Sequence, residues 1–134
     1  MSRLNHVHKY LDNKTEHERL VDGLKSRAYN HLYNTRNRAK KKGIKCTLDY
    51  MWLRDKLKTG KCELTGMAFE VRDKKGYHPF ASSIDRIDNS KGYHKNNCRV
   101  ILNCVNSFKG TLTDDQVLEV TEKLYLGLAQ HLED

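Results

Sequence analysis

The sequence predicts a single α+β domain in which a β-hairpin and the helix that follows it are embedded among longer helices. Residues 83–88 alternate apolar and polar side chains, and a polar loop containing a glycine separates them from the apolar run of residues 99–102. Apolar residues recur at helical spacing before this region, over residues 15–42, and after it, over residues 114–132. Together with a length of 134 residues, these patterns indicate one domain built around the hairpin.

Two helices are expected before the hairpin. Thr15 and Glu18 have the spacing of a capping box, and the helix that they begin is expected to end at Gly43. Its apolar residues recur every four positions, at Leu20, Leu24, Ala28 and Leu32. Thr47 or Asp49 is expected to cap the second helix. The buried stripe of that helix is expected to comprise Leu48, Met51, Trp52 and Leu57.

The sequence pattern of the second half of the chain predicts the hairpin and the last helix. Ile84 and Ile87 are expected to anchor the first strand in the core. Residues 99–102 form either the second strand or the start of the next helix. Residues 113–116 have the pattern of another capping box, which opens an amphipathic and acidic C-terminal helix. The apolar stripe of this helix comprises Val117, Val120, Leu124, Leu128 and Leu132.

Positive charge is concentrated in the first half of the chain. The 25 lysines and arginines outnumber the 17 acidic residues, for a net charge of +8. Residues 1–61 carry 16 basic and 6 acidic residues, residues 62–110 carry 8 and 5, and residues 111–134 carry 1 and 6. A basic half followed by an acidic tail indicates a polyanionic partner, and we expect nucleic acid rather than a merely solvated basic surface.

Neither a membrane segment nor a secretory signal is expected. No apolar run approaches the ~18 residues that cross a bilayer, and residues 1–14 lack the apolar core of a signal peptide. We therefore expect a cytoplasmic protein whose cysteines stay reduced. The four cysteines would suffice for a zinc site, but they form no CxxC pair, so we expect small buried thiols and no structural zinc. These cysteines are Cys46, Cys62, Cys98 and Cys104.

Several short motifs lie around the hairpin: Cys62-x-x-Thr65-Gly66, Ser83-Ile84-Asp85-Arg86-Ile87-Asp88, Lys91-Gly92-Tyr93, Asn96-Asn97-Cys98-Arg99 and Val105-Asn106-x-x-Lys109. Together they resemble the HNH endonucleases, also called ββα-metal or His-Me finger nucleases, many of which are encoded by bacteriophages. The basic segment of residues 38–43 also resembles the one that precedes the motif in a phage-rich branch. The resemblance implies a ββα-metal core over residues 61–110, between a basic helical DNA-binding part over residues 15–60 and a C-terminal helix over residues 111–134.

The resemblance also implies a site for one divalent cation. Asp85 matches the acidic residue that ends the first strand and binds the metal, and Asn106 matches the metal ligand on the helix. Carboxylate and amide oxygens are hard ligands that suit Mg²⁺ or Mn²⁺. Asn97 matches the middle residue of the motif, whose side chain holds the loop in shape. Many HNH proteins carry zinc knuckles, but Thr65 and Val105 replace cysteines of these knuckles here.

The sequence departs from the family at the residue after the metal-binding aspartate. The family has a general-base histidine there, and this chain has Arg86. A guanidinium stays protonated and cannot accept a proton, but it can bind the scissile phosphate and stabilise charge in the transition state. The base is then expected to be His94, with His78, Tyr77 and Tyr93 as alternatives. Water activated by the metal without a dedicated base is a further alternative.

The expected function is that of a metal-dependent DNA endonuclease or nickase that hydrolyses phosphodiester bonds, in the cytoplasm of a bacterial host if it is phage-encoded. The alternative is a DNA-binding protein that keeps the fold but has lost catalysis, with Arg86 as the sign of that loss. In both cases basic residues are expected to contact phosphates. These are Arg36, Arg38, Lys40, Lys41, Lys42, Lys45 and Lys109. The C-terminal helix is a candidate contact of a homodimer, and double-stranded DNA is the favoured partner.

Overall fold

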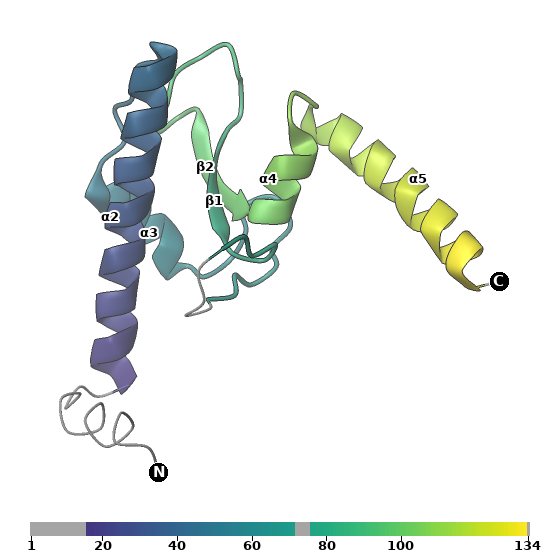
Figure 1. Ribbon diagram of the computed structural model, residues 1–134, viewed down its shortest axis with the longest axis horizontal. Coiled ribbons are helices and arrows are strands. Elements are labelled where there is room, and N and C mark those ends of the chain that lie inside the picture. The colour runs from purple at the N-terminus through teal and green to yellow at the C-terminus, as the bar shows by residue number, and fades with distance from the viewer. Residues whose placement is uncertain (1–15, 72–75, 134) are drawn as a thin grey trace.

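The computed structural model of the protein describes residues 16–71 and 76–133, and it has the α+β architecture that the sequence predicts. In chain order the elements are α2 (Glu16–Lys42), α3 (Tyr50–Lys58), β1 (Ser82–Arg86), β2 (Cys98–Leu102), α4 (Asn103–Lys109) and α5 (Asp114–Glu133). The two strands pair between α2 on one side and α4 on the other, and α5 extends away beyond α4 (Figure 1). The hairpin and α4 thus form a ββα unit among longer helices. No helix in the described ranges is both long and apolar enough to cross a membrane.

Helix α2 is the long basic helix expected before the hairpin. Ala28 and Leu32 are buried in the core that α2 forms with α3 and the strands. The capping box at Thr15 and the side chain of Leu20 lie outside the described residues. The helix stops at Gly43, as predicted, where a φ of +66° is a left-handed conformation that glycine adopts without strain. Three consecutive lysines therefore occupy the last turn, where they complement the helix dipole.

Helix α3 packs against α2 and is capped by Asp49, one of the two candidates. The Asp49 carboxylate accepts a hydrogen bond of 2.9 Å from the backbone N–H of Trp52. The prediction that Met51 is buried is wrong, because this side chain is 52% exposed. Leu53 is buried instead, since at 3.6 residues per turn it shares a face with Leu57 while Met51 points to solvent.

The two strands are antiparallel, and Asp85 lies directly opposite Arg99. On one face of the hairpin, Ile84 packs into the core that includes α2 and α3. The other face carries Asp85 and is covered by α4. The predicted burial of Ile87 is wrong, because the strand ends at Arg86 and the Ile87 side chain, in the loop beyond it, is 51% exposed.

Strand β2 runs directly into α4, and a second capping box opens α5 as predicted. The Thr113 N–H donates to the Gln116 side chain at 2.9 Å, and the Gln116 N–H donates to the Thr113 hydroxyl at 3.2 Å. Val117 is buried, whereas Leu124 and Leu128 of the expected apolar stripe are largely exposed. Three residues of the stripe, Val117, Leu124 and Leu128, line a groove of about 710 Å³ between α4 and α5. The amphipathic character of α5 therefore leaves an open apolar face.

The four cysteines are free thiols that lie in two different apolar clusters. Cys46 and Cys98 belong to the core with α2 and α3, and burial raises the pKa of the Cys98 thiol to about 12. Cys62 and Cys104 pack in the second cluster, next to the end of β2. Within residues 16–71 and 76–133, no group of three or more histidine, cysteine, aspartate or glutamate side chains is placed to hold a metal ion.

Candidate active site

Asp85 lies at the centre of a buried ionic network near the end of β1. Its carboxylate is removed from solvent, with 4% of the residue exposed. The Arg99 Nε donates to Asp85 Oδ2 at 2.9 Å, and the Lys109 Nζ lies 3.2 Å from Oδ1 and 3.3 Å from Oδ2. An unpaired carboxylate in this position would cost several kcal/mol in lost hydration. Two basic side chains therefore keep Asp85 in place.

Lys109 is not positioned to contact DNA, which contradicts the prediction from the sequence. Only 2% of Lys109 is exposed, and its ammonium also lies 3.4 Å from the carbonyl oxygen of Arg86. The reason is the packing of α4 on β1, because long helical side chains lean back toward the amino end of their helix and here reach Asp85. Lys109 is therefore a structural partner of Asp85.

Arg99 extends this network to the start of α5. Its Nη1 and Nη2 donate to the two carboxylate oxygens of Asp114 at 2.8 Å and 2.6 Å, while its Nε faces Asp85. These hydrogen bonds hold the pKa of Asp114 below its ordinary value and raise the pKa of Arg99. A bidentate pair of this kind is stronger and more directional than a single bond. It joins the C-terminal helix to the face of the hairpin that carries Asp85.

Neither Arg99 nor Asp114 was predicted from the sequence to be a site residue. One signal was present, because Arg99 is the charged residue within an otherwise apolar strand, and a buried charge needs a partner. The partner on the facing strand depends on the hairpin register, which a long loop leaves open. Asp114 carried only the signature of a helix start.

Asn106 lies on α4, over the same face of the hairpin as Asp85. Its Nδ2 donates to the Ser83 hydroxyl at 2.7 Å and to the Ile84 carbonyl at 3.1 Å. These two bonds orient the amide group, and its Oδ1 has no hydrogen-bond partner in the described part of the chain. Asn106, a half-buried residue, thus has an amide oxygen that is free to act as a ligand.

The donor set on this face fits a hard divalent cation such as Mg²⁺ or Mn²⁺. Asp85 offers carboxylate oxygens from β1, and Asn106 offers an amide oxygen from α4. Mg²⁺ commonly binds one or two protein carboxylates together with waters and substrate phosphates, so a site built on Asp85 and Asn106 would rely on water and phosphate for its remaining ligands. The Asp85 oxygens also accept from Arg99 and Lys109. A cation would therefore share Asp85 with these two side chains or displace them.

Asn97 holds the loop between the two strands. Its side-chain oxygen accepts from the Asp88 N–H at 3.0 Å, and its Nδ2 donates to the carbonyls of Asp88 and Gly92 at 3.0 Å and 2.9 Å. The Ile87 N–H donates to the Asn97 carbonyl at 2.8 Å, which closes the base of the loop. One buried amide therefore ties together both arms of the loop.

Arg86 follows Asp85 in β1, so its side chain leaves the opposite face of the strand. Its Nη1 donates to the carbonyls of Asn89 and Lys91 at 3.2 Å and 3.0 Å. The guanidinium carbon lies 5.0 Å from the centre of the Tyr93 ring, a cation–π contact. Nε and Nη2 have no hydrogen-bond partner among residues 16–71 and 76–133. One part of the guanidinium thus supports the loop, and the other part is free to bind an anion.

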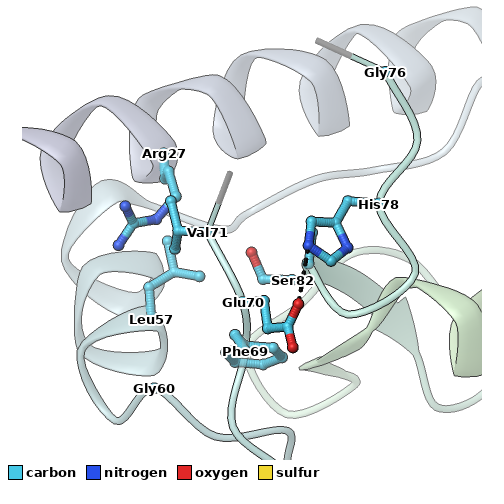
Figure 2. A pocket seen from close by; sticks show the side chains of 10 residues that line it. Arg27, Leu57, Gly60, Phe69, Glu70, Val71, Gly76, His78 and Ser82 are labelled. Carbon is cyan, nitrogen blue, oxygen red and sulfur yellow. Dashed lines mark ion pairs between the residues drawn. The ribbon is translucent and has the colours of Figure 1, made fainter. Parts of the chain in front are cut away.

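His78, one of the alternative bases, lies in a separate cavity. This cavity of about 200 Å³ is bounded by α2, the end of α3 and the segment before β1 (Figure 2). The His78 Nδ1 accepts a hydrogen bond from the Phe80 N–H at 3.1 Å. The His78 Nε2 lies 3.3 Å from the Glu70 carboxylate, which is close enough for an ion pair, but the two groups are not aligned for a hydrogen bond. Among the residues that the structure describes, no contact joins the His78 ring to Asp85 or Asn106.

His94 lies on the hairpin loop and is oriented by Thr47. Its Nδ1 is 3.0 Å from the Thr47 hydroxyl. The tautomer that donates from Nδ1 leaves Nε2 as a proton acceptor, and Nε2 has no hydrogen-bond partner within the described ranges. Of the two tyrosines, Tyr93 is buried beneath Arg86 and Tyr77 is 65% exposed. His94 therefore offers a free ring nitrogen on this loop, although, as for His78, no contact in the described ranges joins its ring to Asp85 or Asn106.

The basic carboxyl end of α2 lies beside the hairpin loop (Figure 1). The link after α2 runs along the loop, because the Tyr93 N–H donates to the Lys45 carbonyl at 2.8 Å and the Thr47 N–H donates to the Tyr93 carbonyl at 2.9 Å. Six exposed side chains form what we call the basic patch, and none of them pairs with a carboxylate of the described residues. The basic patch comprises Arg36, Arg38, Lys40, Lys41, Lys42 and Lys45.

Comparison with known proteins supports the fold. No family model matches the sequence, and no curated protein matches it. Among solved structures, the chain is similar to the rare-cutting HNH restriction endonuclease PacI, with 18% sequence identity and a TM-score of 0.53. The match covers 78% of this chain and 80% of that chain. At this identity the likeness concerns the fold, and it confirms the prediction of an HNH-type ββα architecture.

Proposed function

We propose that this protein is a metal-dependent DNA endonuclease or nickase that hydrolyses phosphodiester bonds. The observation that supports the proposal is that the oxygen-bearing side chains of Asp85 and Asn106 lie on the same face of an HNH-type ββα unit. The similar structure belongs to a restriction endonuclease, which supports DNA as the substrate. The basic patch beside the loop adds unpaired positive charge of the kind that binds a phosphate backbone.

The charges around Asp85 leave the added charge of the transition state to be balanced by a bound cation. Asp85 and Asp114 are balanced by Arg99 and Lys109, so the network is neutral as a whole. Attack of hydroxide on a phosphodiester gathers a second negative charge on the phosphate in the transition state. A bound divalent cation would supply positive charge for the phosphate oxygens.

The remaining residues have roles that follow from their contacts. The basic patch holds the DNA backbone, and the free Nε and Nη2 of Arg86 bind phosphate oxygens. The His94 Nε2 accepts the proton of the attacking water as the new P–O bond forms and the bond to the leaving oxygen breaks. Asn97 keeps the loop that carries His94 in one conformation. Each role concerns a group that is free, or already in place, in the structure.

Cleavage of supercoiled plasmid in Mg²⁺ or Mn²⁺ tests the proposal. We expect the wild-type protein to nick or linearise the plasmid. We expect an Asp85→Asn protein that circular dichroism shows to be folded to lose this activity, because the amide is a weaker ligand of about the same size. Asp55→Asn changes an exposed carboxylate on α3 in the same way and should cut normally. Equal cleavage by Asp85→Asn and the wild-type protein would refute the assignment.

A second function, DNA binding without catalysis, is favoured by two observations. Arg86 stands where the family has its general base, and both oxygens of Asp85 are engaged by basic side chains. A protein of this kind would bind DNA with the salt dependence of the basic patch. It would leave the plasmid intact at every concentration of Mg²⁺ or Mn²⁺, which separates it from the endonuclease in the same assay.

A further inference from the structure

We propose that Asp114 and Arg99 are positioning residues that determine how tightly Asp85 binds a divalent cation. The inference rests on the proposed function, since it concerns the same cation. It assigns a role to the first turn of α5, a helix that otherwise stands apart from the hairpin (Figure 1).

The geometry divides the guanidinium of Arg99 between two carboxylates. Both Nη groups are turned to Asp114, at 2.8 Å and 2.6 Å, and only Nε is turned to Asp85, at 2.9 Å. The Arg99 side chain is 12% exposed, so water offers few alternative partners. Asp114 thus keeps two of the three guanidinium nitrogens of Arg99 from forming hydrogen bonds with Asp85, the carboxylate that would bind the cation.

Loss of the Asp114 carboxylate would redirect Arg99. A guanidinium prefers to pair with a carboxylate through two parallel hydrogen bonds, and Asp85 would be the charged acceptor left to it. The cation would then compete with a bidentate pair instead of a single bond. One additional charge-assisted hydrogen bond corresponds to about a tenfold change in affinity.

The chain provides a matched control for this argument. Asp115 also lies in the first turn of α5, and its carboxylate complements the helix dipole in the same way. Among the described residues Asp115 forms no ion pair with Arg99. Asp115→Asn therefore removes the same charge from the same turn without releasing the guanidinium.

Binding of Mn²⁺ to the full-length protein, measured by titration calorimetry or by electron paramagnetic resonance, tests the proposal without any measurement of cleavage. We expect the Kd of Asp114→Asn for Mn²⁺ to rise about tenfold. Asp115→Asn should stay within about twofold of the wild-type protein, and Asp114→Glu should recover most of the affinity, because it restores a carboxylate to Arg99. Asp114→Ser serves as a second variant in case the asparagine disturbs the helix start, and circular dichroism confirms that each variant is folded.

A double-mutant cycle shows whether Asp114 acts through Arg99. In an Arg99→Gln background there is no guanidinium to redirect, so Asp114→Asn should change the Mn²⁺ affinity by less than about twofold. An unchanged Kd in folded Asp114→Asn, or a tenfold loss that persists in the Arg99→Gln background, would overturn the inference. If the wild-type protein binds Mn²⁺ through Asp85 and cuts DNA, such a result leaves the proposed function intact. If the wild-type protein shows no Asp85-dependent Mn²⁺ binding, both proposals fail.

Discussion

Replacement of Lys109 by methionine separates a buried structural role from a DNA contact. The ammonium lies within 3.4 Å of three oxygens, two on Asp85 and one on the backbone of Arg86. Removal of one partner from a buried ion pair costs ~3–5 kcal/mol. Arg99 still holds Asp85 Oδ2, and methionine fills a similar volume, so we expect a loss of about 2–3 kcal/mol in the free energy of unfolding.

Two measurements together test this expectation. Urea denaturation, followed by the fluorescence of Trp52, the single tryptophan, gives the free energy of unfolding. The slope of DNA affinity against salt concentration gives the number of phosphate contacts, and each lost contact lowers its magnitude by about 0.9. Lys109→Met should leave this slope unchanged. Lys41→Met, in the basic patch, should lower the slope by about 0.9 without loss of stability.

The opposite pattern would refute the reasoning. If Lys109→Met is as stable as the wild-type protein and lowers the salt slope by about 0.9, the ammonium faces DNA and does not hold Asp85.

Four other predictions follow from single side chains. Asn97→Ala should lose about 3 kcal/mol in urea denaturation, because three hydrogen bonds of a buried amide disappear; a loss below about 1 kcal/mol would contradict the loop-holding role. Burial, helped by Arg38 and a second arginine, lowers the pKa of His31 to about 4, below its unfolded value of about 6.5. Because the unfolded chain is protonated first as the pH is lowered, the free energy of unfolding should fall by about 3 kcal/mol between pH 6.5 and pH 4. Urea denaturation at each pH should show that His31→Gln lacks this decrease. His94→Gln should slow plasmid cleavage about 100-fold or more if His94 is the base, and an unchanged rate would favour water without a dedicated base. If two copies associate through α5, Leu124→Glu should convert the dimer to a monomer in sedimentation velocity, and a wild-type monomer would refute the contact.

Signals between neighbouring residues were readable from the sequence. The capping box of α5, the stop of α2 at Gly43 and the cap of α3 each involve groups a few positions apart, so the local pattern contains the whole interaction. The resemblance to the HNH motif likewise implied that Asp85 lies near a strand end and Asn106 on the following helix, which is where the structure has them. The fold class and the candidate ligands were therefore accessible without coordinates.

The face of a helix or strand on which a side chain lies was harder to predict from the sequence. Ile87 and Met51 are apolar, but a strand that ends two residues early, at Arg86, and a helix that starts at Tyr50 leave both in solvent. Apolar character predicts burial only when the boundary of the element is known to within one residue, because one step reverses the face of a strand and turns a helix by about 100°.

The sequence by itself determined the helices, the hairpin, the concentration of positive charge and the residues that match a cation site. Only the tertiary structure decided what surrounds Asp85. Arg99, Lys109 and Asp114 meet through the register of the hairpin, the packing of α4 and the direction of α5, and they bridge sequence separations of 14, 24 and 15 residues. Contacts of this range leave no periodic trace in the chain, because their partners are brought together only when the strands pair and the helices pack.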